Sequence, residues 1–230
     1  MQELFDAIKA GDTARAGALL DADASLADAQ DEHGLSALAV AVYHRRTAVV
    51  ELLESRGARL DVFTAAMSGR TERVEELISG NRSLAQAYSS DGWTALHLAA
   101  FFGHVPAASA LLAKGAAIEA RSDNAMRNTP LHAATAGRQA AVAKLLIDHG
   151  ADVNARQHGG WTPLHSAAQN GDTALADLLL SNGADVSARA ENNQTALDLA
   201  LTKGDQPMAD LLEKRGASLV QQTLRASEPS

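Results

Sequence analysis

The residues that first suggest chemistry are three histidines at nearly equal intervals: His97, His132 and His165. Imidazole is the commonest metal ligand in proteins, so a regular series could form a ladder of ligands. The other five histidines are dispersed and form no pair at the spacing that places two ligands on one helix face: His33, His44, His104, His149 and His158. A metal site would therefore have to come from the regular series.

Other signatures of catalysis are missing from the sequence. It contains no Cys, which excludes a disulfide scaffold, a thiolate zinc site and a cysteine nucleophile. No P-loop, G-x-G-x-x-G or G-x-S-x-G motif is present. The acidic segment between Asp21 and Glu32 lacks the mid-loop glycine of a calcium-binding EF-hand. We expect no catalytic residue, no metal, no cofactor and no enzymatic activity.

Composition limits the class of partner. The 230 residues carry 20 Lys and Arg against 28 Asp and Glu, a net charge of −8, and no basic stripe is visible among the scattered positive residues. Such a chain repels nucleic acid. The first residues, MQELFDAIKAGD, show no basic segment followed by an apolar run, and no apolar stretch reaches the roughly 20 residues that span a bilayer. We expect a soluble cytoplasmic monomer that binds neither nucleic acid nor membrane.

The histidines belong to a longer internal repeat. Trp93-Thr-Ala-Leu-His97 returns as Asn128-Thr-Pro-Leu-His132 and as Trp161-Thr-Pro-Leu-His165. The equivalent position along the chain is held by Phe5, Ala39, Phe63, His97, His132, His165 and Asp198. The intervals between these positions are nearly equal, except for a much shorter one between Ala39 and Phe63. Seven repeats therefore fill nearly the whole chain.

Each repeat reads as a pair of helices. Thr94, Thr129, Thr162 and Thr195, with Ser36 in repeat two, stand where a helix begins and can cap its free N–H groups. Pro130 and Pro163 follow at the first helical position, where the missing N–H does no harm. A second helix carries leucines and valines at i, i+3 and i+4 and ends at a glycine in most repeats, such as Gly115, Gly150 and Gly183.

The Thr-Pro-Leu-His-x-Ala core, Gly150 followed by Ala-Asp-Val-Asn-Ala, and the 33-residue period resemble ankyrin repeats. The resemblance implies an all-α solenoid of about seven helix-turn-helix repeats with β-hairpin fingers, similar to small bacterial ankyrin proteins. We expect the repeat domain at residues 1–217, with repeats at about 1–30, 31–59, 60–90, 91–123, 124–157, 158–190 and 191–217, and a final helix turn and polar tail at 218–230. The histidine then bonds near the capping hydroxyl, and neighbouring repeats stand too far apart to share one metal ion.

Two repeats depart from the period. The short interval between Ala39 and Phe63 leaves no room for a finger in repeat three, and Asp61 is expected to cap the next helix directly. We expect a notch there that exposes Met67 and the flanks of Tyr43 and Phe101. Repeat five has extra residues at 123–127, which predicts a protruding finger.

The few aromatic residues indicate where a partner binds. They make up 3% of the chain, yet six of the eight lie at positions that vary between repeats. Trp and Tyr dominate interface hot spots, and in ankyrin proteins these positions face a concave binding surface. Adjacent helical residues such as Phe101 and Phe102 cannot both face the same core. The predicted partner-binding residues are Tyr43, His44, Met67, Trp93, Phe101, Phe102, Met126, Trp161, Gln169 and Asn170.

These observations favour a non-enzymatic module that binds a protein on its concave face, as an adaptor, an inhibitor or an immunity-type protein. The acidic surface favours a partner with a basic patch. The alternative is a small-ligand binder or hydrolase that uses polar groups in the groove. For the two tryptophans, packing against a neighbouring finger is an equal alternative to partner binding.

Overall fold

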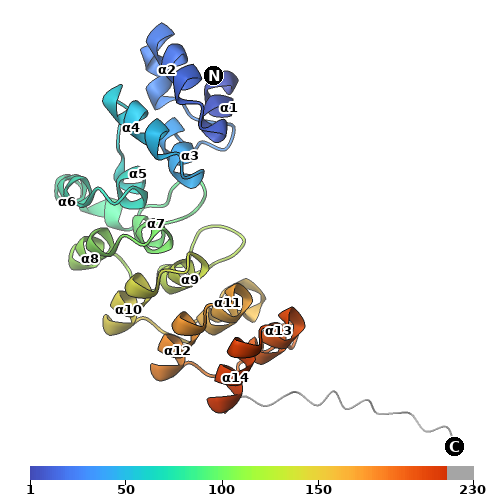
Figure 1. Cartoon of the computed structure of the whole chain (residues 1–230). Helices are drawn as coiled ribbons and strands as arrows, with labels where there is room; N and C mark the ends of the chain where they lie inside the picture. The colour runs from blue at the N-terminus through green and yellow to red at the C-terminus, as the bar shows by residue number, and fades with distance from the viewer. Residues whose placement is uncertain (217–230) are drawn as a thin grey trace, which may run out of the picture. The chain divides into compact units, whose positions relative to one another are not determined.

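The computed structural model describes residues 1–216 of the chain (Figure 1). Its contacts divide the chain into two compact units, Met1–Asp152 and Val153–Ser230, which are described separately. The tail expected at 218–230 lies outside the described residues. Over residues 1–216 the chain forms fourteen α-helices and no β-strand, so the predicted all-α class is confirmed.

The first unit contains five helix pairs that follow one another in chain order (Figure 1). They are α1 (Gln2–Ala10) with α2 (Thr13–Ala22), α3 (Ala37–Tyr43) with α4 (Thr47–Ser55), α5 (Val62–Met67) with α6 (Thr71–Gly80), α7 (Ala95–Phe102) with α8 (Val105–Ala113), and α9 (Pro130–Ala136) with α10 (Ala140–Asp148). Short 3-10 helices follow α2 at Ala24–Asp28 and α6 at Arg82–Ala85. Inner helices pack on inner helices, as α5 on α7 and α7 on α9, while α6 and α10 both pack on the outer helix α8.

The second unit repeats the arrangement with two pairs. They are α11 (Pro163–Asn170) with α12 (Thr173–Ser181), and α13 (Ala196–Lys203) with α14 (Gln206–Lys214), after a 3-10 turn at His158–Gly160. The inner helices α11 and α13 pack together, as do the outer helices α12 and α14. The predicted number of seven helix pairs is therefore confirmed.

The inner helices begin at the predicted caps and pack through small residues. The Thr94 hydroxyl accepts from the backbone N–H of His97, and Thr129 and Thr195 cap their helices in the same way. Leu96 and Leu131 are fully buried, and so are the alanines around them. Because alanine adds little bulk, neighbouring helices approach closely, and stability comes from stacking one repeat on the next.

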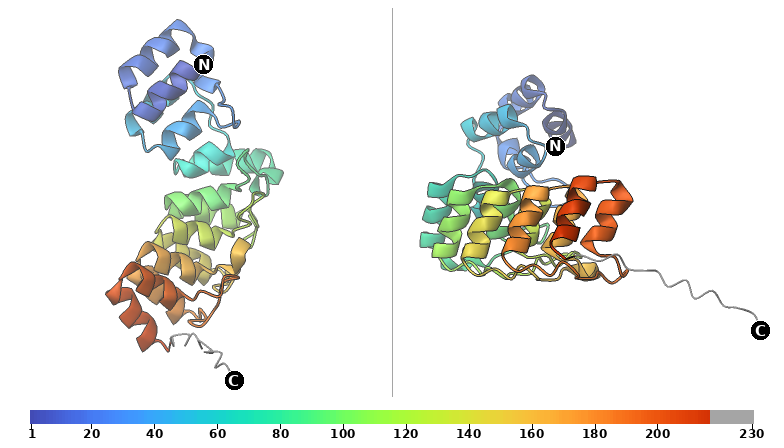
Figure 2. Two further views of the ribbon diagram at one scale, coloured as in Figure 1. Left: turned by 90° about the vertical axis from the view of Figure 1, so that its right-hand side faces the viewer. Right: turned by 60° about the horizontal axis from the view of Figure 1, so that its bottom comes forward.

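The fingers are turns with little β structure. Isolated bridges join Gln30 to Ser36 and Tyr88 to Thr94, and these are the β pairings in residues 1–216. In repeat five the chain from Asp123 to Arg127 forms a loop that stands out beside α9 (Figure 1), and Met126 within it is 48% exposed. This agrees with the predicted protruding finger. Figure 2 shows the finger segments of the green and yellow repeats along one edge of their helices.

Repeat three has no finger, as predicted. The chain passes from α4 to α5 without a bridge, and the Asp61 carboxylate accepts from the Thr64 N–H at 2.7 Å, which caps α5. The prediction that the missing finger exposes Met67 is wrong, however, because this side chain is only 2% exposed. The helix α5 packs on α7, and the fingers on either side close the gap, since a Cβ built on Gly34 would lie 3.3 Å from that of Ser90.

Candidate functional site

Four of the predicted partner-binding residues form one aromatic cluster in the first unit: Tyr43, Trp93, Phe101 and Phe102. The ring of Phe101 meets that of Trp93 edge-on at 5.4 Å between centroids and that of Phe102 at 5.2 Å. Tyr43 continues the series, 5.6 Å from Phe102. All four side chains are half-buried. Aromatic pairs at these distances and tilts attract one another beyond the area that they bury.

The aromatic cluster joins repeats two and four across the short repeat three. Tyr43 ends α3, whereas Phe101 and Phe102 end α7. The Tyr43 hydroxyl also donates to the carboxylate of Asp91 in the finger of repeat four. Burial and this hydrogen bond raise the pKa of Tyr43 far above its ordinary range, so the phenol stays a donor. The rings therefore brace the fold as well as offering a surface.

A finger-side pocket of about 550 Å³ lies on one side of the aromatic cluster. Tyr43, His44, Trp93 and Phe101 line it, so the structure brings these four predicted residues together. The charged groups at its wall are Lys9, Asp31 and Asp91, with His33 beside them. Two carboxylates against one ammonium group make this pocket acidic.

A turn-side pocket of about 500 Å³ lies on the other side, where inner helices turn into outer helices. Phe101, Phe102 and Met67 give it an apolar wall, and Arg45, Arg46 and Arg70 give it positive charge. Charge counted along the chain does not reveal the whole group, because Arg45 and Arg46 are neighbours in repeat two whereas Arg70 comes from repeat three. One signal was present: Arg45 stands where repeats four, six and seven have Gly103, Gly171 and Gly204.

The remaining predicted residues lie elsewhere. Met126 lies exposed in the repeat-five finger. In the second unit, the ring of Trp161 lies 5.7 Å from that of His165 in its own repeat, while Gln169 is exposed and Asn170 is half-buried. The ammonium group of Lys203 donates to the backbone carbonyl of Gln169. These residues line neither pocket.

The regular histidines have the structural role expected of them. Nδ1 of His97 lies 2.8 Å from the Thr94 hydroxyl and Nε2 lies 2.9 Å from the carbonyl of Asn128 in the next finger. His165 bonds to Thr162 and to the Gln194 carbonyl in the same way. Burial lowers the pKa of His97 to about 4, so its ring is neutral. Over residues 1–216, no group of three or more His, Asp or Glu residues could hold a metal ion.

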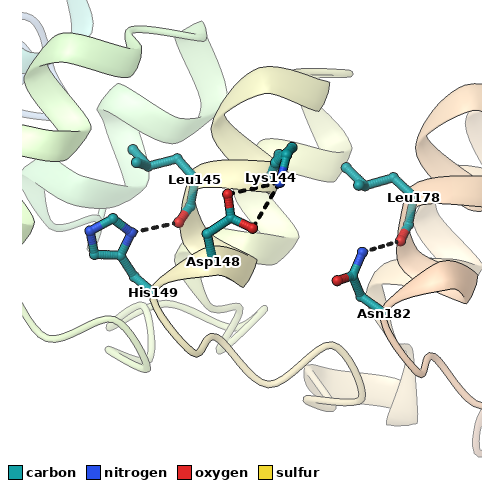
Figure 3. A network of polar contacts seen from close by, with 6 residues as sticks. All are labelled: Lys144, Leu145, Asp148, His149, Leu178 and Asn182. Atoms are coloured by element: carbon teal, nitrogen blue, oxygen red, sulfur yellow. Dashed lines mark hydrogen bonds and ion pairs between the residues drawn. The ribbon is translucent and has the colours of Figure 1, made fainter.

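A polar network at the ends of outer helices also has a structural explanation (Figure 3). In the first unit, Lys144 donates to both oxygens of Asp148 at 2.8 Å, one turn further along α10. His149 Nδ1 lies 2.8 Å from the carbonyl of Leu145. In the second unit, Asn182 donates to the carbonyl of Leu178 at the end of α12. The contacts of His149 and Asn182 satisfy free carbonyls of a helix C-terminus.

Comparison with known proteins agrees with this structure. The family profile described as "Ankyrin repeats (3 copies)" matches residues 62–157 and 155–223. The chain is 34% identical over 129 residues to "Probable E3 ubiquitin-protein ligase XBOS31" of Oryza sativa subsp. japonica, covering 52% of this chain and 28% of that protein. It is 33% identical over 104 residues to "Ankyrin repeat and SAM domain-containing protein 6" of Mus musculus, covering 45% and 12%.

A third relative is "Neurogenic locus Notch protein" of Drosophila melanogaster, 37% identical over 90 residues, covering 39% of this chain and 3% of that protein. The chain thus spans less than a third of each of these relatives. Within residues 1–216, no helix is long and apolar enough to cross a membrane. The repeat period, the paired helices capped by Thr and His, and the profile that matches both units together place the chain in the ankyrin repeat family.

Proposed function

We propose that this protein is a non-enzymatic binding module that holds a protein partner at the aromatic cluster and the finger-side pocket. The observation that carries the proposal is the cluster itself: four half-buried rings meet where two pockets open. An interface gains most of its energy from a few aromatic anchors that exclude water. The ankyrin repeats of the family serve protein–protein interaction, which supports this assignment.

The electrostatics of the finger-side pocket point to a basic group on the partner. Asp31 and Asp91 line it, and the chain as a whole carries a charge of −8. Opposite charge steers association and fixes orientation more than it adds affinity. We propose an adaptor, inhibitor or immunity-type role for a cytoplasmic monomer, with Met126, Trp161, Gln169 and Asn170 as secondary contacts. The ubiquitin-protein ligase activity in the name of the rice relative is said of that protein, and we do not propose it for this chain.

The test is partner capture with a matched pair of variants. Crosslinking and mass spectrometry from the native cell, with purified wild type as bait, should identify a partner. The double variant Phe101→Ala/Phe102→Ala should lose it. Tyr88→Ala is the control, because Tyr88 is an exposed aromatic residue outside the cluster. Retention of the partner by the folded double variant would refute the proposal.

A further inference from the structure

The turn-side pocket differs in charge from the rest of the protein. Arg45, Arg46 and Arg70 line it against the single carboxylate of Glu51, whereas the whole chain carries a charge of −8. His104 adds no charge at neutral pH, because burial lowers the pKa of its ring. Arg70 is neutralised by its ion pair with Glu54, so the net positive charge of the pocket comes from Arg45 and Arg46 against Glu51.

Two of the three guanidinium groups in the pocket have hydrogen-bond or ion-pair partners in the protein, and the third has none among residues 1–216. Arg46 donates to the Lys9 carbonyl at 3.0 and 2.7 Å, and Arg70 makes a two-pronged ion pair with Glu54 at 3.1 and 2.7 Å. The side chain of Arg45 makes no hydrogen bond or ion pair with any residue from 1 to 216. Its donors face solvent and are available to a ligand.

The backbone at Arg45 adds a second, independent observation. Its φ of 55° lies in the left-handed region that disfavours residues with a side chain. At the matching turn, repeats four, six and seven use Gly103, Gly171 and Gly204, with φ of 86°, 66° and 69°. Repeat five has Arg138 at the same turn with a φ of 60°, so the strained backbone alone does not mark a site. Of these two strained arginines, Arg45 is the one whose side chain lines the pocket.

The apolar residues beside the arginines indicate which kind of side chain accompanies the acidic group of the ligand. Phe101, Phe102, Val42 and Val50 line the same cavity of about 500 Å³. A carboxylate can bind the planar guanidinium through two parallel hydrogen bonds. An apolar side chain next to it can then cover the aromatic wall. A cavity of this size admits a few side chains, and the net charge of −8 on the whole chain disfavours densely charged nucleic acid or lipid surfaces.

We propose that the turn-side pocket binds an acidic segment of a protein, in which an Asp or Glu pairs with Arg45 and an adjacent apolar side chain packs against Phe102. The turn-side pocket shares Phe101 with the finger-side pocket and otherwise has its own lining residues, and the proposal does not rest on the partner site described above.

The probe is a phage-displayed library of random 12-residue peptides, selected on the wild-type protein. Selected peptides should be enriched in Asp or Glu beside Leu, Ile, Phe or Met. Their affinity, measured by calorimetry, should fall at least about tenfold in Arg45→Gly and Arg45→Asn. Both replacements tolerate the left-handed backbone, so both variants should keep a thermal midpoint at or above that of the wild type.

Arg138→Gly is the matched control. Arg138 has a φ of 60° at the same turn of repeat five, and it does not line the pocket. Its peptide affinity should stay within about twofold of the wild type.

Three results would overturn the proposal: no enriched peptide, enriched peptides without acidic residues, or equal binding by the Arg45 variants. Binding of phosphatidylserine vesicles or of an oligonucleotide through Arg45, without peptide binding, would replace the proposed ligand class. Because Phe101 lines both pockets and Phe102 lines the turn-side pocket, Phe101→Ala/Phe102→Ala affects both sites, whereas Trp93→Ala changes the finger-side pocket alone. Trp93→Ala should therefore lose the captured partner and keep the selected peptides, and Arg45→Gly should do the reverse.

Discussion

His97 shows how a single residue can hold two structural parts together. Its Nδ1 accepts from the Thr94 hydroxyl at 2.8 Å, while its Nε2–H donates to the Asn128 carbonyl in the next repeat at 2.9 Å. A protonated ring would present an N–H to the donors of Thr94. Both this geometry and burial favour the neutral ring.

The stability of the protein should therefore fall with acid. The pKa of His97 is lowered from 6.5 to about 4 in the folded state, so the unfolded chain binds the extra proton between these values. Stability should be constant above pH 6.5 and lost as the pH falls toward 4, by up to about 3 kcal/mol from this residue. Burial lowers the pKa of His104 and His165 in the same direction.

Urea unfolding measures this loss of stability when it is repeated at pH values from 7.5 to 4.5, a span of about three pH units across the titration of His97. His97→Gln, which cannot titrate, should unfold more easily at neutral pH but show a shallower pH dependence. His33→Gln, the same replacement at an exposed ring, is the control. A wild-type slope in His97→Gln would show that another group controls the effect.

Phe101 and Phe102 should contribute to stability as well as to binding. The sequence alone suggests that at least one ring is exposed in the free protein, whereas both are half-buried and meet edge-on in the aromatic cluster. Truncating a fully buried Phe costs about 3–5 kcal/mol. We expect the double alanine variant to lose about 2–4 kcal/mol and to remain folded. Chemical unfolding measures this, and a loss near zero would place both rings in solvent.

At the scale of elements, the short helix α5 depends on its cap. The Asp61 carboxylate accepts from the backbone N–H and the hydroxyl of Thr64, each at 2.7 Å. Asp61→Ala should lower the free energy of unfolding by about 1 kcal/mol, because an orphan N–H of the first turn loses its partner. Asp61→Asn keeps a capping oxygen and should lose only part of that. Equal losses in the two variants would point to charge instead of capping.

Tyr43 links elements that repeat three leaves apart. Its hydroxyl donates to Asp91 and its ring packs on Phe102. Tyr43→Phe removes the hydrogen bond alone, and the expected loss of stability is about 1–2 kcal/mol. Asp91→Asn on the same link tests the charge, and the double variant should show coupling between the two changes. If the losses of stability in the two single variants simply add in the double variant, the hydrogen bond between Tyr43 and Asp91 contributes nothing.

At the scale of the first unit, the core is not uniform. The buried residues from Leu4 to Ala58 form a cluster of their own, which ends where repeat three begins. Stability in repeat proteins is the sum of repeats and the interfaces between them. The interface at repeat three lacks a finger, and the aromatic cluster compensates for it.

Native-state hydrogen exchange should reveal this division. We expect the slowly exchanging amides of α1 to α4 to open together, at a lower free energy than those of α7 and α9. Tyr43→Ala should speed exchange in α3 and α4 more than in α9. Uniform protection across residues 1–152, unchanged by the variant, would contradict a weak interface at repeat three.

The repeat period, the helix pairs, the Thr–His caps and the missing finger all follow from the amino-acid sequence alone. These are local properties: a capping side chain acts on backbone groups within the first turn of its own helix, and each repeat carries its own signals. Asp61 is identifiable as a cap for this reason, and the resemblance to ankyrin repeats assigns the histidines to structure instead of metal binding.

What the missing finger exposes depends on tertiary structure. Met67 is covered by the packing of α5 on α7 and Tyr43 reaches repeat four, because shortening one repeat brings its neighbours together. Arg45 and Arg70 of the turn-side pocket belong to different repeats and meet only in the fold. Contacts between residues of different repeats depend on stacking geometry, which a pattern within one repeat does not encode.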